Sequence, residues 1–228
     1  MSGEWIELVA SDGHRLQAYH VKPEGDEEPR AGLVIAMEIF GVNGHIRAVA
    51  DSYAAEGYEV IAPQLYDRAE PGIDLAYDAE GVARGRALRE QVGWEGPMLD
   101  VGACVAHLRQ GEAKLPVGIV GYCYGGAVAW LAAARVANLG CAVGYYGTAI
   151  LNFMNAAPKC PTMLHFGSKD QTIPEDKIEA LAEKHPEVAI HVYDADHGFN
   201  SDRRANYDEA AAKLARERTL DFLAAHLR

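Results

Sequence analysis

The sequence lacks a hydrophobic run long enough to cross a membrane, and it lacks any block rich in lysine or arginine. Its 228 residues include 21 lysines and arginines against 33 aspartates and glutamates, which gives a formal net charge of −12. A nucleic-acid interface needs a cluster of basic residues, so nucleic acid is not an expected partner. The opening residues, MSGEWIELVASDG, are too polar for a signal peptide. We therefore expect a cytoplasmic protein with no membrane partner.

Cysteine is also scarce, and its spacing argues against a metal site. The four cysteines are Cys104, Cys123, Cys141 and Cys160, and none of them form a C-x-x-C pair. Structural zinc sites usually bring their ligands in close pairs, so we expect no metal. The sequence contains no H-E-x-x-H, no P-loop and no G-x-G-x-x-G after a strand, so we expect no cofactor. We expect Cys104, Cys141 and Cys160 to be reduced, buried thiols.

Short apolar runs alternate with longer segments of helical spacing along the chain. This alternation predicts an α/β fold with a mainly parallel sheet covered by helices on both faces. An N-terminal β-hairpin is expected over residues 4–10 and 14–21. No linker or repeat divides the chain, so residues 1–228 are expected to form one domain. The expected strands are 32–37, 58–62, 117–120, 142–146, 162–166 and 189–193, and the expected helices are 46–56, 80–91, 97–109, 126–138, 174–184 and 206–227.

Chemically useful side chains directly follow four of these expected strands. In a parallel α/β sheet, ligands bind beyond the carboxyl ends of the strands. Glu38, Cys123, Asp170 and His197 all occupy such positions. We therefore expect two carboxylates, a thiol and an imidazole to share one edge of the sheet.

Cys123 lies in the pattern G-x-C-x-G, formed by Gly121 to Gly125. This is the cysteine form of a nucleophile elbow, in which a strand turns sharply into a helix and needs small flanking residues. The helix N-terminus that follows favours the thiolate and can stabilise an oxyanion. A lone cysteine is more commonly a core residue. The glycine spacing at a strand–helix junction favours a nucleophile here.

Asp170 and His197 follow Cys123 in the order nucleophile, acid, base. His197 would accept the thiol proton, and Asp170 would fix the orientation of its ring. Asp194 and Asp196 are alternatives for the acid, but both lie beside His197 on its own loop. An acid that reaches across from a neighbouring strand suits Asp170 better. The other histidines lack this position after a strand and beside a glycine.

These pieces resemble the dienelactone hydrolase family of the α/β-hydrolase superfamily. The resemblance implies an α/β-hydrolase fold, a Cys123–His197–Asp170 triad, and an oxyanion hole made by the backbone N–H groups of Ile39 and Tyr124. It also implies that Glu38 contacts the resting thiol and helps to generate the thiolate when substrate binds. The matching stretches are MEIFGVN (37–43), VGYCYGG (120–126), VGYYG (143–147), DADHGF (194–199) and ERTLDFL (217–223).

The resemblance weakens at the substrate-binding positions. Family members that open dienelactone hold its carboxylate with two arginines and a tyrosine. Arg84 matches the first arginine, but Leu88 stands at the tyrosine position and Ser201 at the second arginine. Arg203 and Arg204 are nearby replacements that the sequence alone leaves open. The expected substrate-binding residues are Arg84, Leu88, Ser201 and Tyr145.

The resulting expectation is a hydrolase that cleaves a carboxylic ester or lactone through a thioester at Cys123. Its preference for anionic substrates should be smaller than that of dienelactone specialists, because one charge-assisted bond contributes about 1.5–3 kcal/mol. Two alternatives remain open at this point, an acyltransferase and a non-catalytic small-molecule binding protein. A monomer is the expected assembly.

Overall fold

Eight strands form one sheet in the computed structural model, which describes residues 3–25, 28–110 and 114–228. Their order across the sheet is β1-β2-β4-β3-β5-β6-β7-β8. The β1–β2 and β2–β4 pairs are antiparallel, and the remaining pairs are parallel. The strands are β1 Glu4–Val9, β2 Arg15–Val21, β3 Ala31–Ala36, β4 Tyr58–Pro63, β5 Val117–Tyr122, β6 Leu139–Tyr145, β7 Thr162–Gly167 and β8 Ala189–Tyr193.

The expected N-terminal hairpin is present at one edge of the sheet. Its turn is closed by backbone hydrogen bonds between Ala10 and His14 and from Gly13 N–H to the Ala10 carbonyl. Gly13 has a φ of 86°, a conformation that glycine adopts without steric cost. The turn therefore fixes the register in which β1 pairs with β2.

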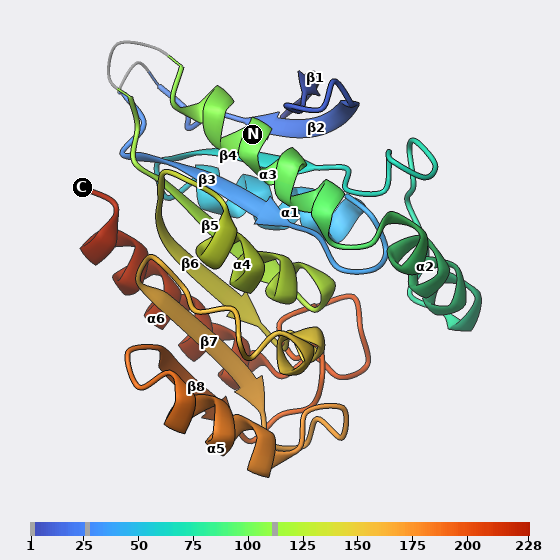
Figure 1. Ribbon diagram of the computed structural model, residues 1–228, viewed down its shortest axis with the longest axis vertical. Coiled ribbons are helices and arrows are strands. Elements are labelled where there is room, and N and C mark those ends of the chain that lie inside the picture. The colour runs from blue at the N-terminus through green and yellow to red at the C-terminus, as the bar shows by residue number, and fades with distance from the viewer. Residues whose placement is uncertain (1–2, 26–27, 111–113) are drawn as a thin grey trace.

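Helices cover both faces of the sheet (Figure 1), as the alternation of apolar runs and helical segments predicts. Helices α3 and α4 lie over one face, where α4 packs against β5 and β6, and α1 and α6 lie over the other. A 3₁₀ helix, η1, follows β6 at Thr148–Asn152. The α-helices are α1 Gly44–Ala54, α2 Ala79–Val92, α3 Glu95–Leu108, α4 Tyr124–Arg135, α5 Glu175–Lys184 and α6 Glu209–His226.

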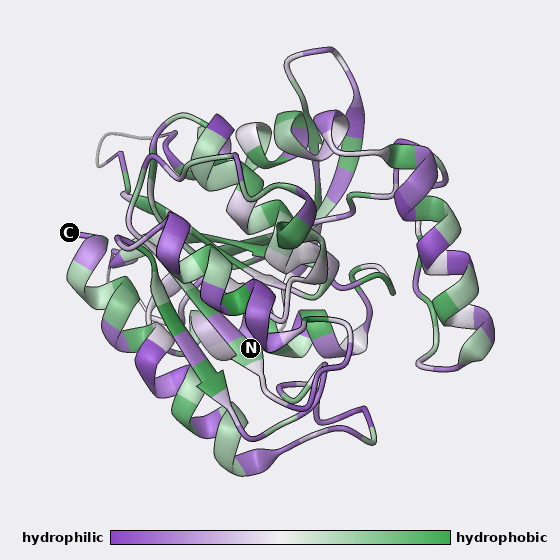
Figure 2. Ribbon diagram, turned by 60° about the horizontal axis from the view of Figure 1, so that its bottom comes forward, coloured by the Kyte–Doolittle hydropathy of each residue, from purple (hydrophilic) through white to green (hydrophobic). Residues whose placement is uncertain are grey.

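The central strands β3 and β5 are buried along their whole length. Burial on both faces explains why these strands are continuous apolar runs rather than alternating ones. Figure 2 shows the same division, with apolar residues along the strands and mixed hydropathy on the outer helices. Among the described residues, no helix combines the length and the apolar character that crossing a membrane requires.

Helix α2 differs from the others because it stands beside the layered body rather than on the sheet (Figures 1 and 2). Asp78 caps its first turn by accepting a 2.7 Å hydrogen bond from the Gly81 N–H. Its position matters for function, because α2 borders the carboxyl ends of the central strands.

Candidate active site

Cys123 occupies the sharp turn between β5 and α4. Its backbone has a φ of 53° and a ψ of −110°, which is strained for a residue with a side chain. A Cβ on Gly121 would lie 1.8 Å from the Gly125 carbonyl oxygen, and a Cβ on Gly125 would lie 2.1 Å from that of Ala36. The two glycines therefore allow the chain to turn this tightly. This geometry is that of a nucleophile elbow.

His197 links Cys123 to Asp170 at the carboxyl edge of the sheet. The His197 Nε2 lies 3.2 Å from the Cys123 Sγ, and its Nδ1 lies 2.6 Å from an Asp170 carboxylate oxygen. The other Asp170 oxygen accepts hydrogen bonds from the Thr172 N–H at 2.9 Å and the Thr172 hydroxyl at 2.6 Å. Asp170 is 3% exposed, so its position is fixed by these contacts rather than by solvent.

Asp194 and Asp196, the alternatives for the acid, are used differently. Asp194 forms a 3.0 Å ion pair with Lys169 and is exposed. Asp196 accepts a 2.6 Å hydrogen bond from the backbone N–H of His197. Neither carboxylate contacts the His197 ring nitrogens, whereas Asp170 does.

The electrostatics of the cluster favour a charged imidazolium. Burial alone would lower the pKa of His197, but the Cys123 sulfur and the Asp170 carboxylate raise it to about 10. Burial acts to raise the pKa of Asp170, yet the hydrogen bonds from His197 and Thr172 prevail and lower it. The arrangement therefore favours a proton on His197 between the Cys123 sulfur and the Asp170 carboxylate.

Two backbone N–H groups beside Cys123 have no acceptor within the described part of the chain. They belong to Ile39, which follows β3, and Tyr124, the first residue of α4. Gly85 on α2 packs directly against the Ile39 peptide, so closely that a Cβ on Gly85 would lie 2.1 Å from the Ile39 carbonyl oxygen. The Tyr66 hydroxyl donates a 3.0 Å hydrogen bond to the Gly85 carbonyl. Free N–H groups in such positions are suited to bind an oxyanion.

Glu38 is fully buried, but it does not contact the resting thiol as the family resemblance implies. One carboxylate oxygen accepts a 2.6 Å hydrogen bond from the Tyr77 hydroxyl, and the other lies 3.5 Å from the Arg204 guanidinium. Among the described residues, Glu38 forms no hydrogen bond with Cys123. The expected thiol contact is therefore corrected, because Tyr77 and Arg204 hold the carboxylate elsewhere.

A cavity of about 220 Å³ opens beside the triad, and three arginines line it. Arg86 and Arg89 come from α2, and Arg204 comes from the loop that follows His197. Arg89 lies 3.8 Å from Glu90, whereas Arg86 forms no ion pair with any described residue. The remaining lining includes the apolar side chains of Ile39, Phe40, Val82 and Ala149.

Arg84, the expected substrate-binding arginine, is not part of this lining. It is exposed and forms an ion pair with Glu70. The reason is helical phase: Val82, Arg86 and Arg89 are four and seven residues apart and share one face of α2. Arg84 follows Val82 by two residues, which places it about 200° around the helix.

Three other expected substrate-binding residues are buried away from the cavity. Leu88 is 1% exposed and packs on the buried face of α2. Ser201 is fully buried in the loop after His197. Tyr145 is also fully buried, and its hydroxyl lies 2.6 Å from that of Thr219 on α6. These positions correct the expectation that the three side chains contact substrate.

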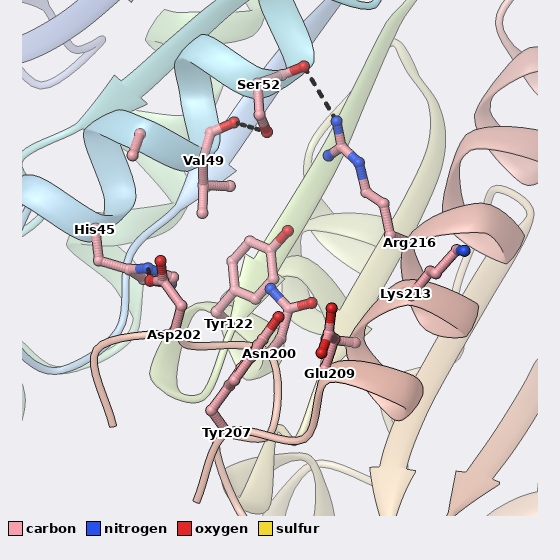
Figure 3. A pocket seen from close by; sticks show the side chains of 12 residues that line it. His45, Val49, Ser52, Tyr122, Asn200, Asp202, Tyr207, Glu209, Lys213 and Arg216 are labelled. Carbon is pink, nitrogen blue, oxygen red and sulfur yellow. Dashed lines mark hydrogen bonds and ion pairs between the residues drawn. The ribbon is translucent and has the colours of Figure 1, made fainter. Parts of the chain in front are cut away.

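A second cavity, of about 440 Å³, lies between α1 and α6 (Figure 3). It contains none of the triad residues, although Tyr122, the neighbour of Cys123, forms part of its wall. His45 and Asp202 point toward each other at its rim, with 3.3 Å between Nδ1 and the carboxylate. Arg216 is fixed across it by a 3.1 Å hydrogen bond to the Ser52 carbonyl.

Sequence reasoning does not identify Tyr77 and Arg86 as site residues. Arg86 and Arg89 follow Val82 by four and seven positions, a spacing that places all three on one face of a helix. This spacing could have pointed to Arg86 instead of Arg84. Arg204 was recognised as an alternative without a decision. Tyr77 lies in an irregular segment between β4 and α2, and no sequence pattern marks it.

Comparison with known proteins places the chain in a family. The model of the dienelactone hydrolase family matches residues 16–227. Carboxymethylenebutenolidase from Pseudomonas putida is 34% identical, with 98% of this chain and 97% of that protein covered. Carboxymethylenebutenolidase 1 from Cupriavidus pinatubonensis is 32% identical, with the same two shares covered. A dienelactone hydrolase-like promiscuous phosphotriesterase from metagenomic libraries has the same fold, with a TM-score of 0.79, 17% identity and 100% of both chains covered. The chain belongs to the dienelactone hydrolase family and has the α/β-hydrolase fold.

Proposed function

We propose that this chain hydrolyses a carboxylic ester or lactone, with Cys123 as the nucleophile, His197 as the base and Asp170 as the residue that orients His197. The observation that carries the proposal is the continuous contact from Cys123 Sγ to His197 Nε2 at 3.2 Å and from His197 Nδ1 to Asp170 at 2.6 Å. Membership of a family of lactone and ester hydrolases supports the reaction class. The two carboxymethylenebutenolidase relatives point to the lactone subclass.

In the first half of the proposed reaction, the Cys123 thiolate forms a bond to the substrate carbonyl carbon. The electron pair of the carbonyl moves onto its oxygen, which accepts hydrogen bonds from the Ile39 and Tyr124 N–H groups. Collapse of this intermediate breaks the bond to the leaving oxygen and produces a thioester. His197 donates its proton to the leaving alkoxide, which stays attached to the acyl group when the substrate is a lactone.

In the second half, His197 removes a proton from water. The resulting hydroxide attacks the thioester carbonyl, and the carbon–sulfur bond breaks to release a carboxylic acid. The thiolate and the protonated imidazole are then restored. Asp170 stabilises the imidazolium and fixes the tautomer in both halves.

The substrate proposed for this cavity carries an anionic group in addition to its ester. Arg86 faces the cavity with no described ion-pair partner, and Arg204 lies between the cavity and Glu38. An anion approaching a chain of net charge −12 needs such local positive charge. The expectation from Leu88 and Ser201, a smaller preference for anions than that of dienelactone specialists, stays a prediction beside this proposal.

The test compares hydrolysis of dienelactone and of the neutral ester p-nitrophenyl acetate by the unmodified protein and by Cys123→Ala. We expect turnover of both substrates to fall to background in the variant, with circular dichroism unchanged. In samples quenched with acid during turnover, mass spectrometry should locate the acyl group on Cys123, and hydroxylamine should release that group as a hydroxamate and restore the free thiol. Near-normal hydrolysis by Cys123→Ala would exclude Cys123 as the nucleophile. Ester products formed from an added alcohol, with little free acid, would favour acyl transfer instead.

A further inference from the structure

The register of the sheet places Glu38 and Cys123 side by side. Strand β3 pairs with β5 in parallel, with Ala36 opposite Gly121. Glu38 lies two residues after Ala36, and Cys123 lies two residues after Gly121. Both residues are therefore at the same edge of the sheet. A carboxylate that turned toward the sulfur would disfavour a second negative charge and keep the thiol protonated. The direction in which Glu38 points therefore affects how reactive Cys123 is.

In this structure the Glu38 carboxylate is directed to Tyr77 instead. The Tyr77 hydroxyl donates a 2.6 Å hydrogen bond to it, a distance typical of a charge-assisted bond from a hydroxyl to a carboxylate. Burial raises the pKa of Tyr77 above its ordinary value, and the nearby Glu38 charge raises it further. Tyr77 therefore keeps its proton and remains a donor to Glu38.

The ring of Tyr77 is itself held by its neighbours. Its centroid lies 4.4 Å from that of Phe40, and the Arg204 guanidinium lies 5.9 Å from it. The His45 ring packs edge-on against it at 6.4 Å. His45 in turn is held by Asp202 at the rim of the second cavity (Figure 3). Because these contacts fix the ring, the hydroxyl has a defined position from which to hold Glu38.

We infer that Tyr77 is a positioning residue that holds the Glu38 carboxylate away from the Cys123 sulfur, so that the resting thiol contacts His197. The inference rests on the proposed role of Cys123 as the nucleophile. It means that Cys123 is reactive before any substrate binds, and that neutral esters reach an already active nucleophile. Tyr77 acts through Glu38 and has no contact with the reacting atoms.

The test measures the rate at which iodoacetamide alkylates Cys123, as a function of pH, in the unmodified protein and in Tyr77→Phe. Peptide mass spectrometry assigns the label to Cys123 and separates it from the other three cysteines. Loss of the hydroxyl removes the shorter of the two contacts that hold Glu38 and leaves the 3.5 Å contact with Arg204. The carboxylate can then turn toward the sulfur, so we expect the alkylation rate near neutral pH to fall about tenfold. The pH profile should shift to higher pH, whereas a loosened loop alone would not shift it in this way.

A second pair of variants shows whether Tyr77 acts through Glu38. Adding Tyr77→Phe to Glu38→Gln should not change the alkylation rate that Glu38→Gln shows by itself. Tyr19→Phe is the matched control, because it removes a 2.8 Å tyrosine–carboxylate hydrogen bond to Asp51 away from the site. Equal profiles for Tyr77→Phe and the unmodified protein would overturn the inference, as would the same tenfold loss in the double variant. Alkylation does not require turnover, so failure of the proposed hydrolysis would leave this result readable.

Discussion

The sulfur of Cys123 and the Nε2 of His197 are 3.2 Å apart, although 74 residues separate them in the chain. Their contact depends on the parallel order of β5, β6, β7 and β8, which brings the carboxyl ends of β5 and β8 to one edge. Asp170 joins them from the end of β7, between the two.

Replacing Asp170 by Asn should lower kcat by about two to four orders of magnitude. The amide cannot stabilise a positive imidazole and allows the wrong tautomer of His197. Asp194→Asn is the matched control, because Asp194 is an exposed carboxylate on the His197 loop that pairs with Lys169. Steady-state kinetics with p-nitrophenyl acetate would test both variants. Similar losses of kcat in the two variants would show that Asp170 has no special role.

Arg86→Ala should reduce kcat/KM for an anionic ester or lactone by about one to two orders of magnitude, which corresponds to one charge-assisted hydrogen bond. The same change should have little effect on a neutral ester. Arg84→Ala, on the opposite side of α2, should leave both values near those of the unmodified protein. If Arg84→Ala gave the larger loss for the anion, the helix face assigned to the cavity would be wrong.

Gly125→Ala should destabilise the folded protein by at least about 3 kcal/mol, because the added Cβ would lie 2.1 Å from the Ala36 carbonyl oxygen. Gly102→Ala is the contrasting change in α3, where a Cβ meets no atom within 4 Å. There the substitution should stabilise the protein by about 0.5–1 kcal/mol. Urea unfolding followed by circular dichroism measures both effects. A mild effect of Gly125→Ala would contradict the close packing of the elbow.

The raised pKa of His197 predicts a dependence of stability on pH. Folding raises this pKa from 6.5 to about 10, so the folded protein binds the proton more tightly than the unfolded chain. The resulting stabilisation is fully present below about pH 6.5 and is lost as the pH rises through about 10. The Tm difference between the unmodified protein and His197→Gln should therefore shrink between about pH 6 and about pH 10. A constant difference over this interval would show that the imidazolium contributes no such stabilisation.

The sequence was sufficient to predict the alternating strands and helices, because the central strands are buried on both faces and are continuously apolar. It also predicted which side chains share the catalytic edge, since parallel strands end at the same edge of a sheet. Cys123 directly follows β5, and Asp170 and His197 lie in the loops that follow β7 and β8. The expectation that these three side chains lie close together therefore needs only the parallel arrangement of the strands.

The substrate-facing side of α2 could not be predicted in the same way. The buried face of this helix consists of Gly81, Gly85 and Leu88, and two glycines give a weak hydrophobic signal. Without that signal the sequence leaves the rotation of the helix about its axis open, and Arg84 is expected from the family resemblance alone. The direction of the Glu38 side chain was equally hidden, because it depends on Tyr77, a residue in an irregular segment 39 positions away.

The parallel strand order also bears on when activity can arise during synthesis. The thiol and its glycine turn are made early, but His197 follows β8, the last strand of the sheet. A nascent chain that has folded through β6 would present a strained cysteine with neither acid nor base beside it. The three side chains can therefore meet only after β7 and β8 join the sheet, and hydrolysis in a translation reaction should appear only once they have done so.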